Sequence, residues 1–303
     1  MLINQSSRHP LVLIIVLLLF FIAGLFISQF LIFGSLYPFI GDKVMDLASI
    51  VANPNEYQEY KYVLLYVQGM TSFGSMILAP ILFLQYFYKH EINYFVNMPR
   101  EIFFFLTAIL VIVSMPANAW IAEQNMQMKL PAFLIDMERW MAGKEAELKI
   151  LTEYLTTFQT NTQFLVGLVV IALIPAIGEE LLFRAGLQNL FNDAFKNKHV
   201  AIWLAAIIFS GIHLQFYGFF PRMFLGALFG YLYLWSGNIL IPMTGHFVNN
   251  GFTLLLIHLK NVNQIKVDLE TTQDIPTGLI VGSGFLFTAL LVFFHRQARL
   301  ARA

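Results

Sequence analysis

The sequence predicts an all-α fold, a polytopic bundle of about eight transmembrane helices. Of the 303 residues, 58% are hydrophobic and only 12% are charged, whereas soluble domains carry roughly 25% charged residues. The mean hydropathy is +0.69, and apolar stretches of ~20 residues, long enough to cross a bilayer, recur along the chain. We therefore expect a multi-pass protein of the cell (inner) membrane with the lipid bilayer as its surroundings.

The first predicted span, residues 11–36, follows Arg8 and His9 as a signal peptide would. It is too long for one and lacks a small-residue cleavage site, so we expect it to be retained. The shortest predicted span is the sixth. The seven spans after the first are expected at 63–88, 102–122, 164–190, 200–217, 223–235, 239–259 and 277–294.

Lys and Arg in the short flanking loops predict the orientation, because such loops are enriched in these residues on the cytoplasmic side. Their density favours both termini in the cytoplasm. The residues that would lie on that side are Arg8, Lys89, Arg100, Lys196, Lys198, Arg296, Arg299 and Arg302.

Residues 129–158 differ from the spans, because apolar residues at helical spacing alternate with charges there. We expect an amphipathic extramembrane helix resting on the bundle or the membrane interface, or a lid or substrate guide over a site. This segment divides the chain into N-terminal transmembrane helices (1–128), the interfacial segment (129–158) and a domain with the last helix (159–303).

Few ionisable residues fall inside the predicted spans, and a charge at the bilayer centre costs ~2.5–3.5 kcal/mol on insertion scales. Glu180 and Arg184 are four residues apart on one predicted helix, so they share a face and are expected to pair. Glu179 is rotated by about 100° from its neighbour and needs a partner elsewhere. The complete set is Glu179, Glu180, Arg184, His213 and His246, with Asn249 and Asn250 close by.

The two histidines lie on other predicted helices. Phe209 and His213 are four residues apart, as are His246 and Asn250. At ~1.5 Å per residue, these groups and the glutamates lie at compatible depths for one mid-membrane cluster. A lone intramembrane histidine or a single ion pair is ordinary helix packing, but this conjunction on three helices indicates a functional site.

Proline and glycine support this prediction. Pro175 and Pro242 each precede part of the cluster by one turn, and a proline frees a backbone carbonyl and kinks its helix. Gly178, Gly186 and Gly211 are expected to permit close helix approach.

The order of these motifs resembles the CPBP family of intramembrane proteases, which includes the type II CAAX prenyl endopeptidases. The sequence has Glu179-Glu180-x-x-x-Arg184, Phe209-x-x-x-His213 and His246-x-x-Asn249-Asn250, in order and on separate predicted helices. The resemblance implies an endopeptidase acting on peptide bonds of membrane-associated or C-terminal-tail substrates. It also implies that Glu179 activates water with His213, that His246 and Asn250 stabilise the oxyanion, and that Glu180, Arg184 and Phe209 support them.

Cofactors are not favoured. Glu179, His213 and His246 are a chemically reasonable zinc set, but the histidines lie on different helices and a glutamate-activated water needs no metal. The absence of Cys excludes thiolate metal sites and a cysteine nucleophile, and zero net charge gives no sign of nucleic-acid binding. Two other functions remain open, a non-proteolytic scaffold or immunity protein that binds a partner at the same polar site, and a transporter with a proton or ion relay.

Overall fold

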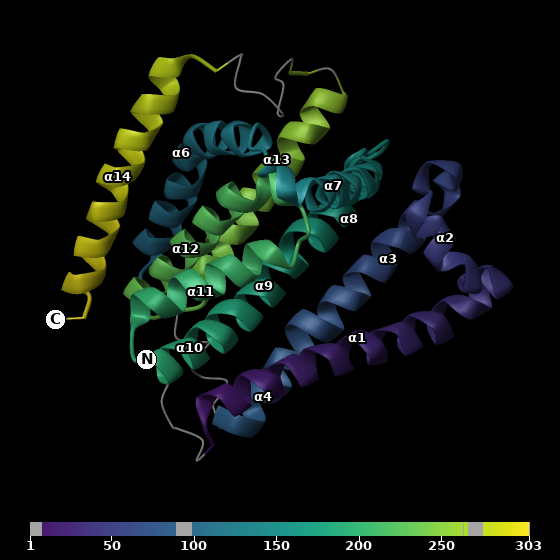
Figure 1. The fold of residues 1–303 in the computed structure, drawn as a ribbon, viewed down its shortest axis with the longest axis horizontal. Coiled ribbons are helices and arrows are strands. Elements are labelled where there is room, and N and C mark those ends of the chain that lie inside the picture. The colour runs from purple at the N-terminus through teal and green to yellow at the C-terminus, as the bar shows by residue number, and fades with distance from the viewer. Residues whose placement is uncertain (1–7, 89–98, 263, 266–274, 303) are drawn as a thin grey trace.

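The structure, a computed structural model, describes residues 8–88, 99–262, 264–265 and 275–302 (Figure 1). Every regular element within these ranges is a helix. Six of the helices are long and apolar enough to cross a membrane. The predicted all-α, polytopic membrane fold is therefore confirmed.

Three long helical stretches come first. α1 (Pro10–Ile40) starts at a proline, and the His9 side chain accepts a hydrogen bond from the Leu11 amide at its N-terminus. The chain then turns through α2 (Leu47–Ala52) into a second stretch made of α3 (Lys61–Ser72), the π-helical η4 (Phe73–Leu78) and α4 (Ala79–Tyr88). The third is α6 (Glu101–Met126).

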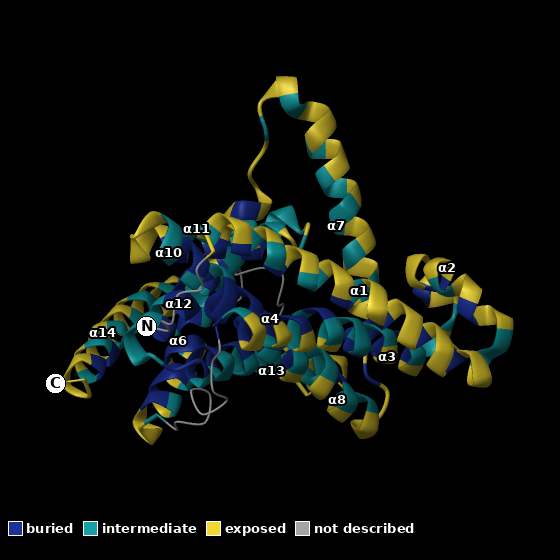
Figure 2. Ribbon diagram, turned by 90° about the horizontal axis from the view of Figure 1, so that it is seen from below, coloured by how far each residue is buried: buried dark blue, intermediate teal, exposed yellow. Residues whose placement is uncertain are grey.

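The predicted amphipathic segment forms η5 (Ala132–Leu134) and α7 (Ile135–Thr156). Figure 2 shows α7 rising away from the bundle, across the direction of α1 and α3. Its C-terminal end rests on the bundle, where Tyr154 and Leu155 are buried against α2 and α3. Its first half has a smaller contact, in which the ring of Trp140 lies 5.5 Å from that of Phe216 after α11, while Phe133 in η5 is 82% exposed. The predicted helix is confirmed, and its C-terminal end makes the buried contacts with the bundle.

A continuous helix of 35 residues, from Asn161 to Phe195, follows α7. It is here called the glutamate helix. Thr160 caps its start by accepting from the Gln163 amide, and Lys196, in the left-handed region at φ 53°, ends it. Its parts are α8 (Asn161–Gly167), η6 (Leu168–Leu173), α9 (Ile174–Glu180), η7 (Leu181–Gln188) and α10 (Asn189–Phe195), with η6 and η7 π-helical.

Four helices complete the bundle, α11 (Lys198–Gly211), α12 (Phe219–Ser236), α13 (Leu240–Asn261) and α14 (Thr277–Leu300). Each of the eight predicted spans coincides with a helix, but the fifth, 200–217, is α-helical only as far as Gly211. α11, with 14 residues, and α12 are not among the six helices that qualify as spans. The count of eight spans therefore stays a prediction for these two helices.

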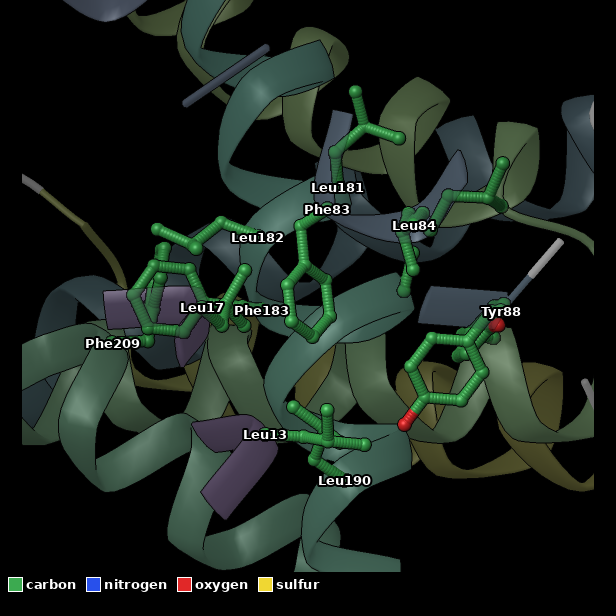
Figure 3. Close-up of a cluster of buried hydrophobic side chains, with 13 residues drawn as sticks. Leu13, Leu17, Phe83, Leu84, Tyr88, Leu181, Leu182, Phe183, Leu190 and Phe209 are labelled. Carbon is green, nitrogen blue, oxygen red and sulfur yellow. The ribbon is translucent and has the colours of Figure 1, made fainter. Parts of the chain in front are cut away.

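The first helices pack directly on the glutamate helix. Figure 3 shows Leu13 and Leu17 of α1 and Phe83 of α4 in one buried cluster with Leu181 and Phe183 of η7. This packing gives α1 and α4 a structural role that the sequence motifs did not indicate. They hold the helix that carries the two glutamates.

Close helix contact at glycine is confirmed at two of the three predicted positions. A Cβ on Gly178 would lie 2.8 Å from the Cβ of Met76 in η4, and one on Gly186 would lie 2.9 Å from a methyl group of Leu17. Gly211 is different, because a Cβ there would meet nothing within 4 Å. That part of the prediction is wrong, since Gly211 ends α11 and does not lie against another helix.

Candidate active site

Glu179 and Glu180 lie at the centre of the bundle, at the last two positions of α9 and directly before the π-helical η7. Their exposed fractions are 8% and 0%. π-Helical turns inside α-helices are frequent at functional sites. Two buried carboxylates side by side require compensating cations or donors.

Glu180 has two partners on two helices. Its Oε2 lies 3.0 Å from Nε of Arg184, which confirms the predicted ion pair. Its Oε1 lies 2.8 Å from Nδ1 of His246 on α13. An ionised Glu180 requires Nδ1 of His246 to carry the proton of that hydrogen bond. The carboxylate therefore ties α13 to the glutamate helix as well as holding Arg184.

Arg184 is enclosed on all sides. Its Nη2 donates to the Gly226 carbonyl of α12 at 2.9 Å. Its guanidinium carbon lies 4.9 Å from the ring centre of Phe209 and 5.7 Å from that of Phe229. Aromatic faces attract a guanidinium through their quadrupole. Phe209, the predicted support residue, thus contacts the cation that neutralises Glu180.

Glu179 faces the second nitrogen of the same imidazole. Nε2 of His246 lies 3.7 Å from Oε2 of Glu179, and Phe229 stacks on the ring at 5.4 Å between centroids. Oε2 of Glu179 is buried and accepts no hydrogen bond from any residue that the structure describes. An oxygen that is shielded from bulk water and lacks a protein donor is suited to bind a single water molecule.

His213 is not inside a helix, which corrects the prediction that it lies within a span. α11 ends at Gly211, and His213 follows in a turn, with Leu214 in the left-handed region at φ 54°. Its Nδ1 lies 2.7 Å from the Phe209 carbonyl, so the ring still packs over the end of the helix. Phe209 contacts both histidines, with its ring centre 5.2 Å from that of His213 and 6.0 Å from that of His246, so the structure brings His213 to the cluster from the end of α11.

Asn250 lies one turn after His246 on α13. Its Nδ2 is 3.5 Å from the carbonyl oxygen of Ile171 in η6, and its Oδ1 accepts from Asn249. The α-helical donor for the Ile171 carbonyl would be the nitrogen of Pro175, which has no N–H. Asn250 is thus directed at the carbonyl that Pro175 frees, and its amide joins α13 to the glutamate helix.

Arg222, at the start of α12, lies close to the turn that carries His213 and was not singled out by the sequence analysis. Its Nη2 donates to Oε1 of Gln215, two residues after His213, at 2.8 Å. The predicted sixth span began one residue later, which placed this arginine outside the membrane. An ionisable residue at the edge of a predicted span was the signal that could have identified it.

Glu179, His213 and His246 were the possible zinc ligands in the sequence analysis, which favoured no metal, and that expectation stays a prediction. Within the described part of the chain, no three His, Cys, Asp or Glu side chains are grouped so that they could hold a metal ion. Nδ1 of His246 is occupied by Glu180, and its Nε2 lies beside Glu179. The carboxylate and the imidazole are therefore arranged to interact with each other.

Comparisons with known proteins agree with the position of this site. Residues 161–252 match the family model described as type II CAAX prenyl endopeptidase Rce1-like. Over 105 residues the chain is 30% identical to the uncharacterized protein YpbD of Bacillus subtilis (strain 168). The aligned part is 33% of this chain and 51% of that protein, so the chain spans about half the length of this curated relative. No solved structure matches the chain.

The matched segment begins at the first residue of α8 and ends within α13. It includes all the residues of the three motifs, and it leaves α1 to α7 and α14 outside. The family resemblance predicted from those motifs is confirmed. Residues 161–252 are therefore similar to the Rce1-like domain of the type II CAAX prenyl endopeptidases.

Proposed function

We propose that this protein is an intramembrane endopeptidase that hydrolyses peptide bonds of membrane-associated or C-terminal-tail substrates with a glutamate-activated water. The observation that supports this most is the buried Oε2 of Glu179, which accepts no hydrogen bond from the described residues and faces His246. A carboxylate in a low-dielectric cavity is a stronger base than in water. The protein would act in the cell membrane with both termini in the cytoplasm.

In the first step, Glu179 takes a proton from a water molecule that His213 helps to orient, and the water oxygen attacks the scissile carbonyl carbon. The carbonyl becomes a tetrahedral oxyanion. In the second step, the carbon–nitrogen bond breaks, and Glu179 returns the proton to the leaving amine. The products are a carboxylic acid and an amine, which become a carboxylate and an ammonium group when the acid proton passes to the amine, and this scheme uses no metal.

His246 is proposed to meet the oxyanion as an imidazolium. Nδ1 donates to Glu180, so Nε2 can donate to a substrate oxygen only when both nitrogens carry protons. In that state the buried cluster is neutral, since the charges of Glu179 and Glu180 are balanced by those of Arg184 and His246. When Glu179 takes its proton, the surplus positive charge favours the oxyanion.

Asn250 is proposed as the second oxyanion donor. Its 3.5 Å separation from the Ile171 carbonyl is long for an N–H···O hydrogen bond, for which 2.7–3.2 Å is usual. Little is lost when such an amide turns from the backbone to a substrate. Catalytic hydrogen bonds are often long in the unliganded enzyme and shorten in the reacting complex.

Arg222 adds a cation at the same site. It is held beside the turn that carries His213 by hydrogen bonds to Gln215. Two of its N–H groups are used by Gln215, and a guanidinium has five. Electrostatic stabilisation by a fixed cation near the developing oxyanion is the role that we assign to it.

The test is a comparison of membrane peptides from cells that lack the protein, cells with the wild type and cells with Glu179→Gln. Glutamine keeps the size of the side chain and removes the base. We expect a peptide that is cut only with the wild type, and its cleavage by purified wild-type protein in proteoliposomes. If Glu179→Gln supports full biological function and the same peptides, the protein acts as a scaffold. Solute flux through proteoliposomes without peptide cleavage would indicate a transporter.

A further inference from the structure

A cavity of about 440 Å³ with both polar and apolar lining residues lies between helices α10, α11 and α12, at the end of the bundle where α14 also ends (Figure 1). Small-molecule sites have volumes of roughly 300–1,000 Å³. The residues that line it and carry the argument are Asn189, Asn192, Lys198, Tyr233, Gly237 and Arg302.

The cavity is positively charged. Lys198 comes from the first position of α11, and Arg302 follows α14. Its described lining residues include no carboxylate. The nearest cavity at the same end, which Arg8 and Lys196 line, does contain an acidic residue, Asp193. The two cations of the larger cavity therefore select an anion.

Local geometry holds Arg302 in place. Its Nη2 donates to the Leu234 carbonyl at 2.7 Å, which leaves the other guanidinium N–H groups for a ligand. Gly237, in the left-handed region at φ 69°, lies beside it, and a Cβ there would be 3.2 Å from the same nitrogen. A glycine both allows this backbone turn and leaves room for the guanidinium.

The remaining wall is suited to the boundary between lipid and water. Ala201 and Leu234 line it together with Tyr233, whose hydroxyl accepts a hydrogen bond from Nδ2 of Asn189 at 3.1 Å. Tyrosine is enriched at the level of lipid headgroups. The cavity thus combines two cationic side chains and the side-chain amides of Asn189 and Asn192 with an apolar wall, at the end of apolar helices.

We propose that this cavity binds the phosphate headgroup of an anionic phospholipid, with Lys198 and Arg302 contacting the phosphate. Basic pockets between transmembrane helices are known sites for such headgroups. A soluble phosphate compound has the same charge, but the apolar wall favours a ligand that carries acyl chains. The site is separate from the glutamate cluster, so the proposal does not depend on peptide hydrolysis.

The experiment measures lipid binding to the full-length, detergent-solubilised protein by native mass spectrometry during titration with phosphatidylglycerol or phosphatidylcholine. The test variant is Lys198→Gln/Arg302→Gln. The matched control is Arg296→Gln/Arg299→Gln, which removes the same charge from exposed positions of α14 that do not line the cavity. Inorganic phosphate and glycerol 3-phosphate are added as competitors. Size-exclusion profiles show whether each variant is folded.

We expect the wild type to bind phosphatidylglycerol at least tenfold more tightly than phosphatidylcholine. The test variant should lose at least tenfold in affinity, and the control less than threefold. Equal losses in both variants, or equal binding of the two lipids, would show that only diffuse surface charge is involved and would overturn the proposal. Displacement of the lipid by millimolar phosphate would overturn the lipid assignment in favour of a soluble anion. If the double variant does not fold, the exposed Lys198→Gln alone gives the same comparison with Arg299→Gln.

Discussion

The substitution Glu180→Gln separates the roles of the two adjacent glutamates. Glutamine keeps the side-chain size, and its carbonyl can still accept from Nδ1 of His246. What is lost is the negative charge 3.0 Å from Arg184, whose exposed fraction is 1%. Removal of one member of a buried ion pair costs about 3–5 kcal/mol, because the other charge is left uncompensated. At ~2–4 °C per kcal/mol, the melting temperature should fall by about 10 °C.

The assay is thermal unfolding of the purified protein in detergent, with Glu179→Gln as the matched control. The carboxylate of Glu179 lies 3.7 Å from its histidine partner, so this control should melt within a few degrees of the wild type while losing cleavage. The double variant Glu180→Gln/Arg184→Met should recover most of the lost stability, because a buried ion pair replaced by apolar groups is often neutral. The reasoning is refuted if Glu180→Gln melts like the wild type, or if the double variant stays as unstable as the single one.

Three further predictions use the peptide identified by the comparison of membrane extracts, or the purified protein itself. Asn250→Ala should lower turnover about tenfold or more, and Asn249→Ala far less, because only Asn250 shares the face of His246; the opposite ranking would mean that the oxyanion donor is misassigned. Arg222→Gln should reduce kcat about tenfold with a smaller change in KM, and Arg222→Lys should restore part of it, since the cation is what acts; unchanged turnover in Arg222→Gln removes this residue from the mechanism. Elemental analysis of the purified protein should find less than one zinc ion per chain, and activity should survive a strong chelator. One tightly bound zinc ion per chain, with activity lost on chelation and restored by zinc, would make Glu179, His213 and His246 metal ligands.

The spacing of residues along one helix was sufficient to predict part of the candidate site. Glu180 and Arg184 lie on one helix, and an i, i+4 pair depends only on helical geometry. The contact between Glu180 and His246 joins residues 66 positions apart, and no periodicity within a single helix can predict it. The sequence also predicted that Glu179 has a partner on another helix, without identifying it. In the structure that partner is Nε2 of His246.

The errors have a common physical cause, which is the position of helix ends. Apolar residues continue past Gly211, so hydropathy extended the helix through His213, although glycine is a frequent residue where helices end. The same difficulty placed Arg222 just before a predicted span when it lies within α12. The first two spans carried no motif, and their role as packing partners of the glutamate helix follows only from buried contacts between distant segments.

The glutamate helix has a mechanical consequence that follows from its length. Its 35 residues correspond to about 52 Å, well beyond the ~30 Å of a hydrocarbon core, so it has to tilt. Glu179 lies 18 residues after the first residue of this helix and 16 before the last, so it is close to the middle. When the tilt of the helix changes, the depth of its two ends in the bilayer changes, but the depth of its middle does not. In the proposed reaction, the bond to be cut would thus keep its depth relative to the bilayer midplane in thick and thin membranes alike, while the two ends of the helix adjust to the thickness.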